Sequence, residues 1–211
     1  MKKILLIGDS IRVGYDKYVK MAFEGEAEVY FPAENCRFAA YVTRCLHEWR
    51  DKLKLGEDLD LIHWNAGLWD DLILLDGEHF TPLPVYEMYI ERACKMMNRF
   101  FPKAKMIFAT STPVKEELFT TCKRYNKDTE AYNLAAVNIV TRYGGVINDL
   151  YSEVKAAPKS YYSDLTHLYT KGGTKLLTEK VVSAIENELS IKGKELDYDA
   201  LFAKTDKIVG I

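Results

Sequence analysis

A serine follows the first apolar run of the chain, in a position where it could act as a nucleophile. Ile4 to Ile7 is unbroken apolar sequence and ends at Gly8-Asp9-Ser10. A buried parallel strand with this pattern delivers the next residues to the carboxyl edge of a sheet, where chemistry collects in open α/β folds. A serine nucleophile needs a base, a group that orients the base, and donors for the developing oxyanion.

His167 is the predicted base. The chain contains four histidines: His47, His63, His79 and His167. The first lies in a predicted helix and the second in a predicted strand, which favours structural roles, and the third is expected to be solvated in a long loop. His167 follows Asp164 by three residues, a spacing that places two side chains on the same side of a turn. The Asp164 carboxylate could then orient the imidazole and leave Nε2 to take the Ser10 proton. The alternative is that Asp164 caps a helix and His167 is a surface residue.

Strands and helices alternate along the chain, which predicts a parallel sheet covered on both faces. Strands are predicted at residues 4–7, 27–31, 59–64, 104–110 and 146–151. Helices are predicted at residues 10–23, 38–53, 85–101, 128–142 and 172–189. Because parallel crossovers are right-handed, the loops that leave the strands should meet at one edge, and the loop 163–167 can reach it. Residues 1–189 are interpreted as one α/β domain, and 190–211 as a tail with apolar clusters at 201–202 and 208–209. The tail is expected to pack on the domain or on a second subunit.

Composition excludes several classes of function. The 211 residues are 48% hydrophobic and 28% charged, and the formal net charge of −2 comes from interspersed signs. This balance gives no case for nucleic acid or an anionic membrane surface, and the apolar runs are too short to span a bilayer. Lys2-Lys3 with a short apolar run and no cleavage site is interpreted as the start of a strand, so the chain is expected to be cytoplasmic or to have lost a leader. The cysteines are expected to be buried, reduced thiols.

The ordered segments resemble the SGNH hydrolase superfamily, also called GDSL-like esterases and acylhydrolases. The resemblance covers nearly the whole chain and rests on segments that occur in the order the family uses: Ile4 to Ser10, Asn65 to Asp70, Thr112-Pro113, Asn133, Val146 to Tyr151 and Asp164 to His167. It implies a flavodoxin-like three-layer α/β/α sandwich with a five-stranded parallel sheet. It also implies Ser10 as nucleophile, His167 as general base and Asp164 as the group that orients it.

The resemblance further implies three oxyanion donors, and here the sequence departs from the family. The first donor is the backbone N–H of Ser10. The second comes from a segment that usually contains glycine after asparagine, whereas this chain has Asn35-Cys36-Arg37-Phe38. Arg37 or Cys36 would then donate its backbone N–H, and a positive φ would disfavour either residue.

The third donor is usually an asparagine side chain, but the motif here reads Gly67-Leu68-Trp69-Asp70. Asn65, at the exit of the third strand, is assigned this role. The alternative is that Asn65 satisfies the backbone of its own turn.

Four further residues are candidates near the site. Arg12 could bind an anionic part of a substrate, or it could be solvated or cap a helix. Trp69 could stack on a sugar ring or line an acyl pocket, while Trp64 is expected in the core. Asp9 and Asp70 are predicted to be hydrogen-bond acceptors that fix loops.

The sequence therefore predicts a serine esterase that needs no metal or organic cofactor. The expected substrates are small-molecule or saccharide esters, with small acyl groups such as acetyl on carbohydrate or related metabolites. An acyl-lipid or acyl-thioester hydrolase of the same family is one alternative, although the loop 68–84 lacks a long apolar lid. A catalytically impaired binding protein on this fold is another. A nucleotide-binding module lacks support because neither phosphate-loop glycine motif is present.

Overall fold

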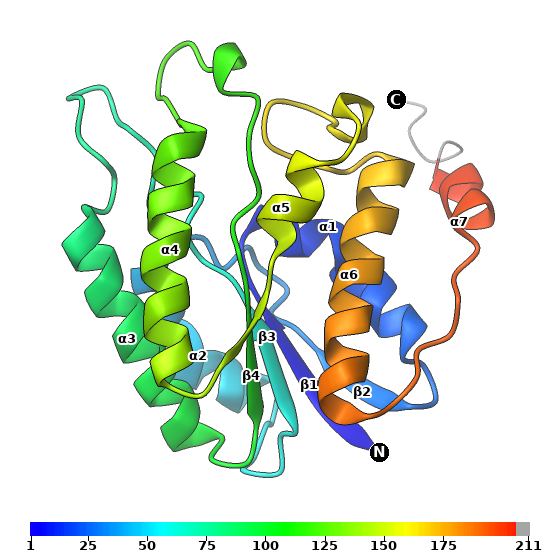
Figure 1. Ribbon diagram of the computed structural model, residues 1–211. Coiled ribbons are helices and arrows are strands. Elements are labelled where there is room, and N and C mark those ends of the chain that lie inside the picture. Colours follow the sequence, from blue (N-terminus) through cyan, green and yellow to red (C-terminus); the bar gives the residue numbers. More distant parts are fainter. Residues whose placement is uncertain (206–211) are drawn as a thin grey trace.

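The computed structural model describes residues 1–205, and these form a parallel sheet between two layers of helices (Figure 1). The strands are β1 (Lys2–Ile7), β2 (Ala27–Tyr30), β3 (Leu61–Trp64), β4 (Lys105–Ala109) and β5 (Val146–Asn148). The helices are α1 (Ser10–Ala22), α2 (Ala39–Lys52), α3 (Leu83–Phe100), α4 (Asn126–Arg142), α5 (Leu150–Lys155), α6 (Lys171–Leu189) and α7 (Tyr198–Thr205). Short 3₁₀ turns lie at Glu116–Leu118 and Lys159–Tyr161.

The strand order is β2-β1-β3-β4-β5, and every neighbouring pair is parallel. This is the flavodoxin-like order, in which the chain reverses its direction of winding between β1 and β3. Loops diverge at such a switch point and leave a crevice at the carboxyl ends of the strands. Ser10 follows β1 and Asn65 follows β3, so both residues lie at this point of the sheet. The predicted three-layer sandwich with five parallel strands is confirmed.

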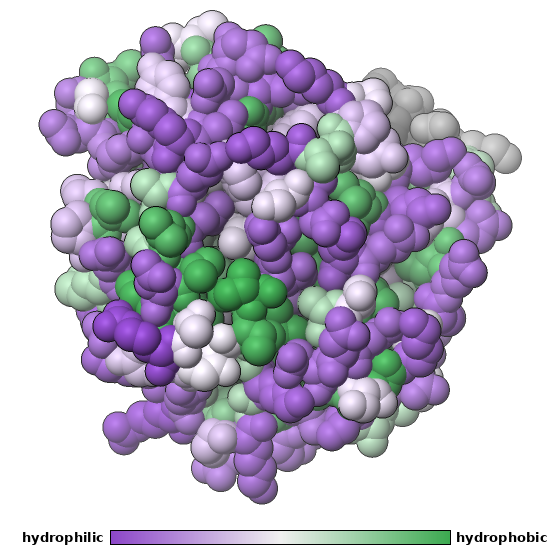
Figure 2. All heavy atoms as spheres, in the orientation of Figure 1, coloured by the Kyte–Doolittle hydropathy of each residue, from purple (hydrophilic) through white to green (hydrophobic). Residues whose placement is uncertain are grey.

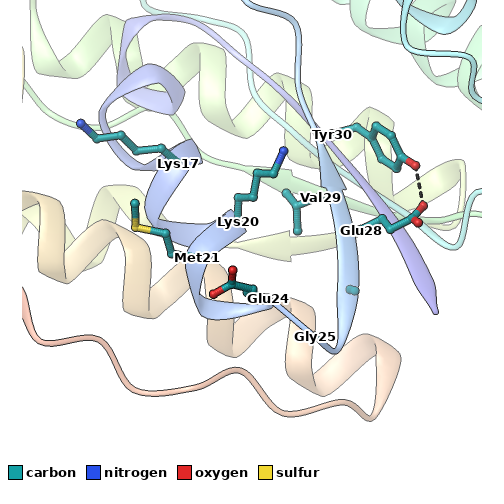
Figure 3. A pocket seen from close by; sticks show the side chains of 9 residues that line it. Lys17, Lys20, Met21, Glu24, Gly25, Glu28, Val29 and Tyr30 are labelled. Carbon is teal, nitrogen blue, oxygen red and sulfur yellow. Dashed lines mark hydrogen bonds between the residues drawn. The ribbon is translucent and has the colours of Figure 1, made fainter.

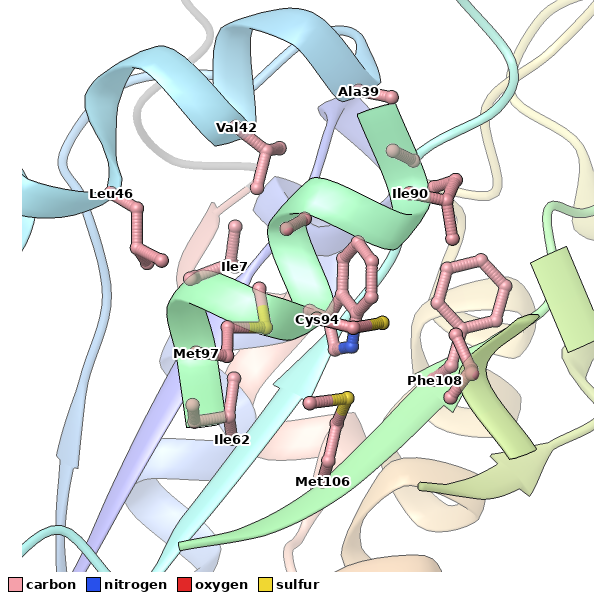
Figure 4. Close-up of a cluster of buried hydrophobic side chains, with 14 of the residues drawn as sticks. Ile7, Ala39, Val42, Leu46, Ile62, Ile90, Cys94, Met97, Met106 and Phe108 are labelled. Carbon is pink, nitrogen blue, oxygen red and sulfur yellow. The ribbon is translucent and has the colours of Figure 1, made fainter. Parts of the chain in front are cut away.

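Two cores pack on the two faces of the sheet, because alternate side chains of a strand point to opposite sides. Leu5 and Ile7 of β1 lie in the core formed with α2, α3 and α4, whereas Ile4 and Leu6 lie in the core formed with α1, α5 and α6. Figure 4 shows the first of these cores, where side chains from α2 and α3 meet those of the strands. The rigid β1 that results holds Gly8-Asp9-Ser10 at its end.

Two helices were not expected from the sequence. The run 146–151 was predicted as a strand, but β5 ends at Asn148 and α5 begins at Leu150. Asp149 explains the change, because its carboxylate accepts the Ser152 N–H and caps the new helix.

The second unexpected helix is α7, in the tail. Its Phe202 ring stacks on Tyr18 of α1 with centroids 6.0 Å apart, and the Lys194 N–H donates to the Ala22 carbonyl. Residues 190–205 therefore lie against the main body of the chain. The predicted apolar cluster at 208–209 lies outside the described residues.

Most of the face in Figure 2 is hydrophilic, with an apolar patch near its centre in the region between α4 and α6 of Figure 1. Within residues 1–205, no helix is long and apolar enough to cross a membrane. The cysteines are free thiols, three of them buried and Cys122 partly exposed.

Candidate active site

Ser10, His167 and Asp164 form a continuous hydrogen-bonded chain. The Ser10 Oγ lies 2.8 Å from Nε2 of His167, and Nδ1 of the same ring lies 2.7 Å from Oδ2 of Asp164. Ser10 and His167 are separated by 157 positions in the sequence. This is the arrangement in which an imidazole, held by a carboxylate through Nδ1, can accept a proton from a serine hydroxyl at Nε2.

The end of β1 and the start of α1 place the nucleophile. Ser10 is the first residue of α1, and Asp9 is its N-cap, with Oδ1 accepting the Ile11 N–H at 2.9 Å. Asp9 is fully buried, and this burial raises its pKa, although the Ile11 N–H and the Asn65 side chain oppose the rise. Among residues 1–205 no acceptor binds the Ser10 N–H, which therefore stays available at the positive end of a helix dipole.

The loop before α6 fixes the base. Oδ1 of Asp164 accepts the backbone N–H groups of Thr166 and His167, both at 2.7 Å, while Oδ2 faces the imidazole. Burial alone would raise the pKa of Asp164, but these two N–H groups and the imidazole outweigh it and lower the pKa. The carboxylate is thus held ionised and in place by its own loop.

Tyr169 joins this loop to the nucleophile. Its hydroxyl donates to the Ser10 carbonyl at 2.6 Å, and its ring stacks on the His167 imidazole with centroids 4.7 Å apart. Burial raises the pKa of Tyr169 to about 12, so the hydroxyl remains a donor at neutral pH. Sequence reasoning missed this residue, and its only signal was an aromatic side chain two positions after the base.

The predicted second oxyanion donor is already bonded within the protein. Arg37 has a φ of 54°, the left-handed conformation that the missing glycine would have favoured. Its N–H donates to Oδ1 of Asn35 at 2.8 Å, and the Cys36 N–H donates to the Gly8 carbonyl at 3.0 Å. The segment therefore lies beside the end of β1, but both of its candidate N–H groups have protein acceptors.

Asn65 lies at the switch point, next to the residues that precede the nucleophile. It is 4% exposed, and a Cβ on Gly8 would lie only 2.0 Å from its Oδ1. Only glycine at position 8 allows this approach. The Asn65 Oδ1 has no hydrogen-bond partner among the described residues, and the side chain also faces Asp9.

Arg12 is placed as a structural residue, which does not support the prediction that it binds an anionic substrate at the mouth of the site. Its side chain is 1% exposed and forms an ion pair with Asp16. It also donates to the carbonyls of Gly8, Pro32 and Glu34. Arg12 therefore ties α1 to the segment that leads to Arg37.

The loop after β3 is held by two buried carboxylates. Asp70 accepts the Ala39 N–H at 3.0 Å, and burial raises its pKa to about 7. Burial likewise raises the pKa of Asp71 to about 6, against the opposing effect of the Thr129 hydroxyl and Arg124. Sequence reasoning missed Asp71 and its partners, because they come from the loop after β3 and from the region of α4. Asp70 thus joins this loop to the start of α2.

The remaining predicted residues are spread over different environments. Trp64 is fully buried in the core, as predicted, whereas Trp69 is half-buried beside Asp70. His63 is also fully buried, and this burial lowers its pKa to about 3. The side chain of His47 is 49% exposed, and it lies outside the hydrogen-bonded chain of Ser10, His167 and Asp164.

His79 is not solvated, contrary to the prediction. It is half-buried, and its Nδ1 lies 3.0 Å from the Asp71 carbonyl. The loop that carries His79 therefore folds back on the residues after β3 instead of leaving the ring in solvent.

A separate hollow lies away from the catalytic residues. It has a volume of about 610 Å³ and lies between the second half of α1 and the edge strand β2 (Figure 3). Lys17, Lys20, Glu24 and Glu28 are among its lining residues, and no member of the triad is. Charges of both signs mix there, which marks no single class of ligand.

Comparison with known proteins finds similarity in structure. The sequence matches no family model and no curated protein. An acetyl xylan esterase of known structure superposes with a TM-score of 0.69 at 14% identity, covering 87% of this chain and 99% of the esterase. The lipase/acylhydrolase from Enterococcus faecalis superposes with a TM-score of 0.69 at 19% identity, covering 93% of this chain and 100% of that protein. A GDSL-like lipase from Bacteroides thetaiotaomicron superposes with a TM-score of 0.69 at 17% identity, and the superposition covers 89% of each chain. The chain therefore has the fold of the SGNH hydrolases, as its sequence motifs imply.

Proposed function

We propose that the protein is a serine ester hydrolase that uses Ser10, His167 and Asp164. The observation that carries the proposal is the hydrogen-bonded chain from Ser10 Oγ through the imidazole to Asp164, with both links at or below 2.8 Å. In addition, proteins with this fold include esterases and acylhydrolases. Residues 1–189 would form the catalytic domain, and the tail would pack on it.

The reaction proceeds through an acyl-enzyme. The Ser10 Oγ attacks the acyl carbonyl carbon while Nε2 of His167 takes the hydroxyl proton. The tetrahedral intermediate collapses when the imidazolium returns this proton to the leaving alcohol. Water, deprotonated by the same imidazole, then attacks the acyl-enzyme, and the imidazolium returns the proton to Ser10 Oγ as the acid is released. Asp164 keeps the imidazole in the required orientation throughout.

The oxyanion is proposed to bind at the N-terminus of α1. The Ser10 N–H is the first donor, and the backbone N–H of Arg37 and the side chain of Asn65 are the proposed second and third. An incoming oxyanion would have to replace Asn35 as the acceptor for Arg37. The Asn65 amide would have to turn from Asp9 toward the substrate.

The proposed substrates are esters of small acyl groups, acetyl above all, on carbohydrate or related metabolites. Two neighbours in structure are acetyl xylan esterases, which supports this class, and two neighbours described as lipases keep acyl-lipid esters as the alternative. Half-buried Trp69 is a proposed contact for the sugar or acyl group. Rates on p-nitrophenyl acetate, butyrate and octanoate, and on an acetylated xylo-oligosaccharide, test this proposal. A rate that rises with chain length would reject it.

A fluorophosphonate probe tests the proposed chemistry directly. It should label the wild-type protein and not Ser10→Ala, since the probe reacts with an activated serine. The engaged Arg37 N–H favours a second candidate, a binding protein with impaired catalysis. A wild type that is neither labelled nor able to hydrolyse p-nitrophenyl acetate would favour this second candidate.

A further inference from the structure

We propose that Tyr169 is a positioning residue that holds the His167 imidazole against the first turn of α1. The inference rests on the proposed function, because it assigns His167 the role of base. Tyr169 would do this with two parts of its side chain. The hydroxyl binds the backbone of the nucleophile, and the ring covers one face of the base.

The contacts of Tyr169 connect two segments that are remote in sequence. Its hydroxyl lies 2.6 Å from the Ser10 carbonyl oxygen, and Ser10 is 159 positions away. Its ring is inclined by only 23° to the imidazole, with centroids 4.7 Å apart. One side chain therefore spans the nucleophile and the base.

The Tyr169 ring packs against α1 at Gly14. A Cβ at position 14 would lie 2.7 Å from Cε1 and 2.8 Å from Cδ1 of Tyr169, closer than packed atoms allow. Gly14 lies one helical turn after Ser10, inside a helix where glycine is destabilising relative to alanine. The close approach of the Tyr169 ring accounts for this glycine.

Asp164 orients the imidazole, but the hydrogen bond between the two side chains is open to water. The side chains of His167 and Asp164 are 27% and 45% exposed, and exposed pairs of this kind contribute little to stability by themselves. A stacked ring restricts rotation of the imidazole. The same ring face attracts the positive charge that the imidazole gains when it takes the Ser10 proton. Tyr169 would thus keep Nε2 aimed at Ser10 in both protonation states.

Two substitutions distinguish the role of the Tyr169 ring from the role of its hydroxyl. Tyr169→Leu removes both. We expect kcat for p-nitrophenyl acetate to fall about 10–100-fold, because the imidazole is then no longer aligned with Ser10. KM should stay within about twofold of wild type. Tyr169→Phe keeps the ring and should retain kcat within about fivefold of wild type, the effect of one hydrogen bond. The proposal is overturned if the phenylalanine variant falls as far as the leucine variant, or if the leucine variant keeps full activity.

Gly14→Ala tests the site without changing any polar group. The new Cβ should displace the Tyr169 ring and lower kcat by an amount between those of the two Tyr169 variants, while alanine favours the helix. Tyr143→Leu, at the remote end of α4, is the matched control for Tyr169→Leu and should keep kcat within about twofold of wild type. Wild-type kcat in Gly14→Ala would overturn the proposed role of the ring.

A spectroscopic measurement distinguishes failure of this proposal from failure of the proposed function. The proton between Nδ1 of His167 and Asp164 should give a downfield ¹H NMR signal, assigned by its loss in Asp164→Asn. We expect the signal in wild type and in Tyr169→Phe, and its broadening or loss in Tyr169→Leu. An unchanged signal in Tyr169→Leu would overturn the positioning role even if the wild type is an esterase. A lost signal would support that role even if no ester is hydrolysed.

Discussion

The base side and the oxyanion side of the site differ in how complete they are. On the base side, Asp164, His167 and Ser10 are already joined by hydrogen bonds in the geometry that proton transfer requires. On the oxyanion side, the Arg37 N–H is bonded to Asn35, and the Asn65 side chain faces Asp9. In the proposed mechanism, one half of the machinery is assembled before substrate arrives, and the other half has to exchange protein acceptors for the substrate.

The origin of this difference lies in where the residues come from. The base side is built largely within one loop, where Asp164 binds the N–H groups of Thr166 and His167 and so fixes itself. The oxyanion side combines the exits of three strands, and short polar side chains there bond the nearest backbone groups. The loop that carries the base therefore completes its own hydrogen bonds. On the oxyanion side the Arg37 N–H is bonded within its own loop, and the Ser10 N–H has no acceptor among residues 1–205. Four predictions test this contrast.

The largest effect is expected on the base side. Ser10→Ala and His167→Ala should each lower kcat about 10⁴–10⁶-fold, and the double variant should be no worse than either, because the residues act as a unit. Asp164→Asn should lower kcat less. Rates with p-nitrophenyl acetate measure these losses, and exposed Ser160→Ala serves as a control with wild-type activity. If the losses of kcat in the two single variants multiplied in the double variant, Ser10 and His167 would not act as a unit.

Arg12 should matter for stability, because it ties α1 to the segment before Arg37. Arg12→Ala leaves the Asp16 carboxylate buried without its partner and should lower the free energy of unfolding by about 3–5 kcal/mol. Arg44→Ala, which breaks an exposed i,i+4 pair with Glu48, should lower it by only about 0.5 kcal/mol. Urea denaturation measures both. If stability is unchanged and KM rises only for esters that carry a carboxylate, Arg12 binds substrate after all.

Asn65→Ala should reduce kcat about 10²–10³-fold if its side chain stabilises the oxyanion, while KM changes little. Asn98→Ala, at the surface of α3, is the matched control. Unchanged kcat in Asn65→Ala would shift the role of third donor to Trp69 or to a water molecule.

The smallest effect is expected from the carboxylates that support the loop after β3. The pKa of Asp70 is raised to about 7 and that of Asp71 to about 6, so the folded protein binds more protons than the unfolded chain between about pH 4 and about pH 7. Their contribution to stability is complete below about pH 4 and is lost as pH rises through about 7. Asp70→Asn should make the free energy of unfolding depend less on pH between 4 and 8. Exposed Asp76→Asn should leave that dependence as it is in wild type.

The fold was largely predictable because its signals are local. Apolar runs marked the strands, helical spacing marked α1, α2, α3, α4 and α6, and turn residues separated them. The errors came from short elements. Asp149 capped a helix where a strand was expected, and α7 has only eight residues, too few for a clear apolar period.

The sequence by itself determined the candidate triad, because the Gly-Asp-Ser and Asp-x-x-His motifs each lie within a few consecutive residues. Only the tertiary structure decided the surroundings of that triad. Arg12 became a buried support, Asn65 turned to Asp9, and Tyr169 packed on Gly14 and His167. The physical reason is that a motif specifies residue types along the chain, whereas burial and hydrogen-bond partners depend on segments that meet only after the sheet has formed.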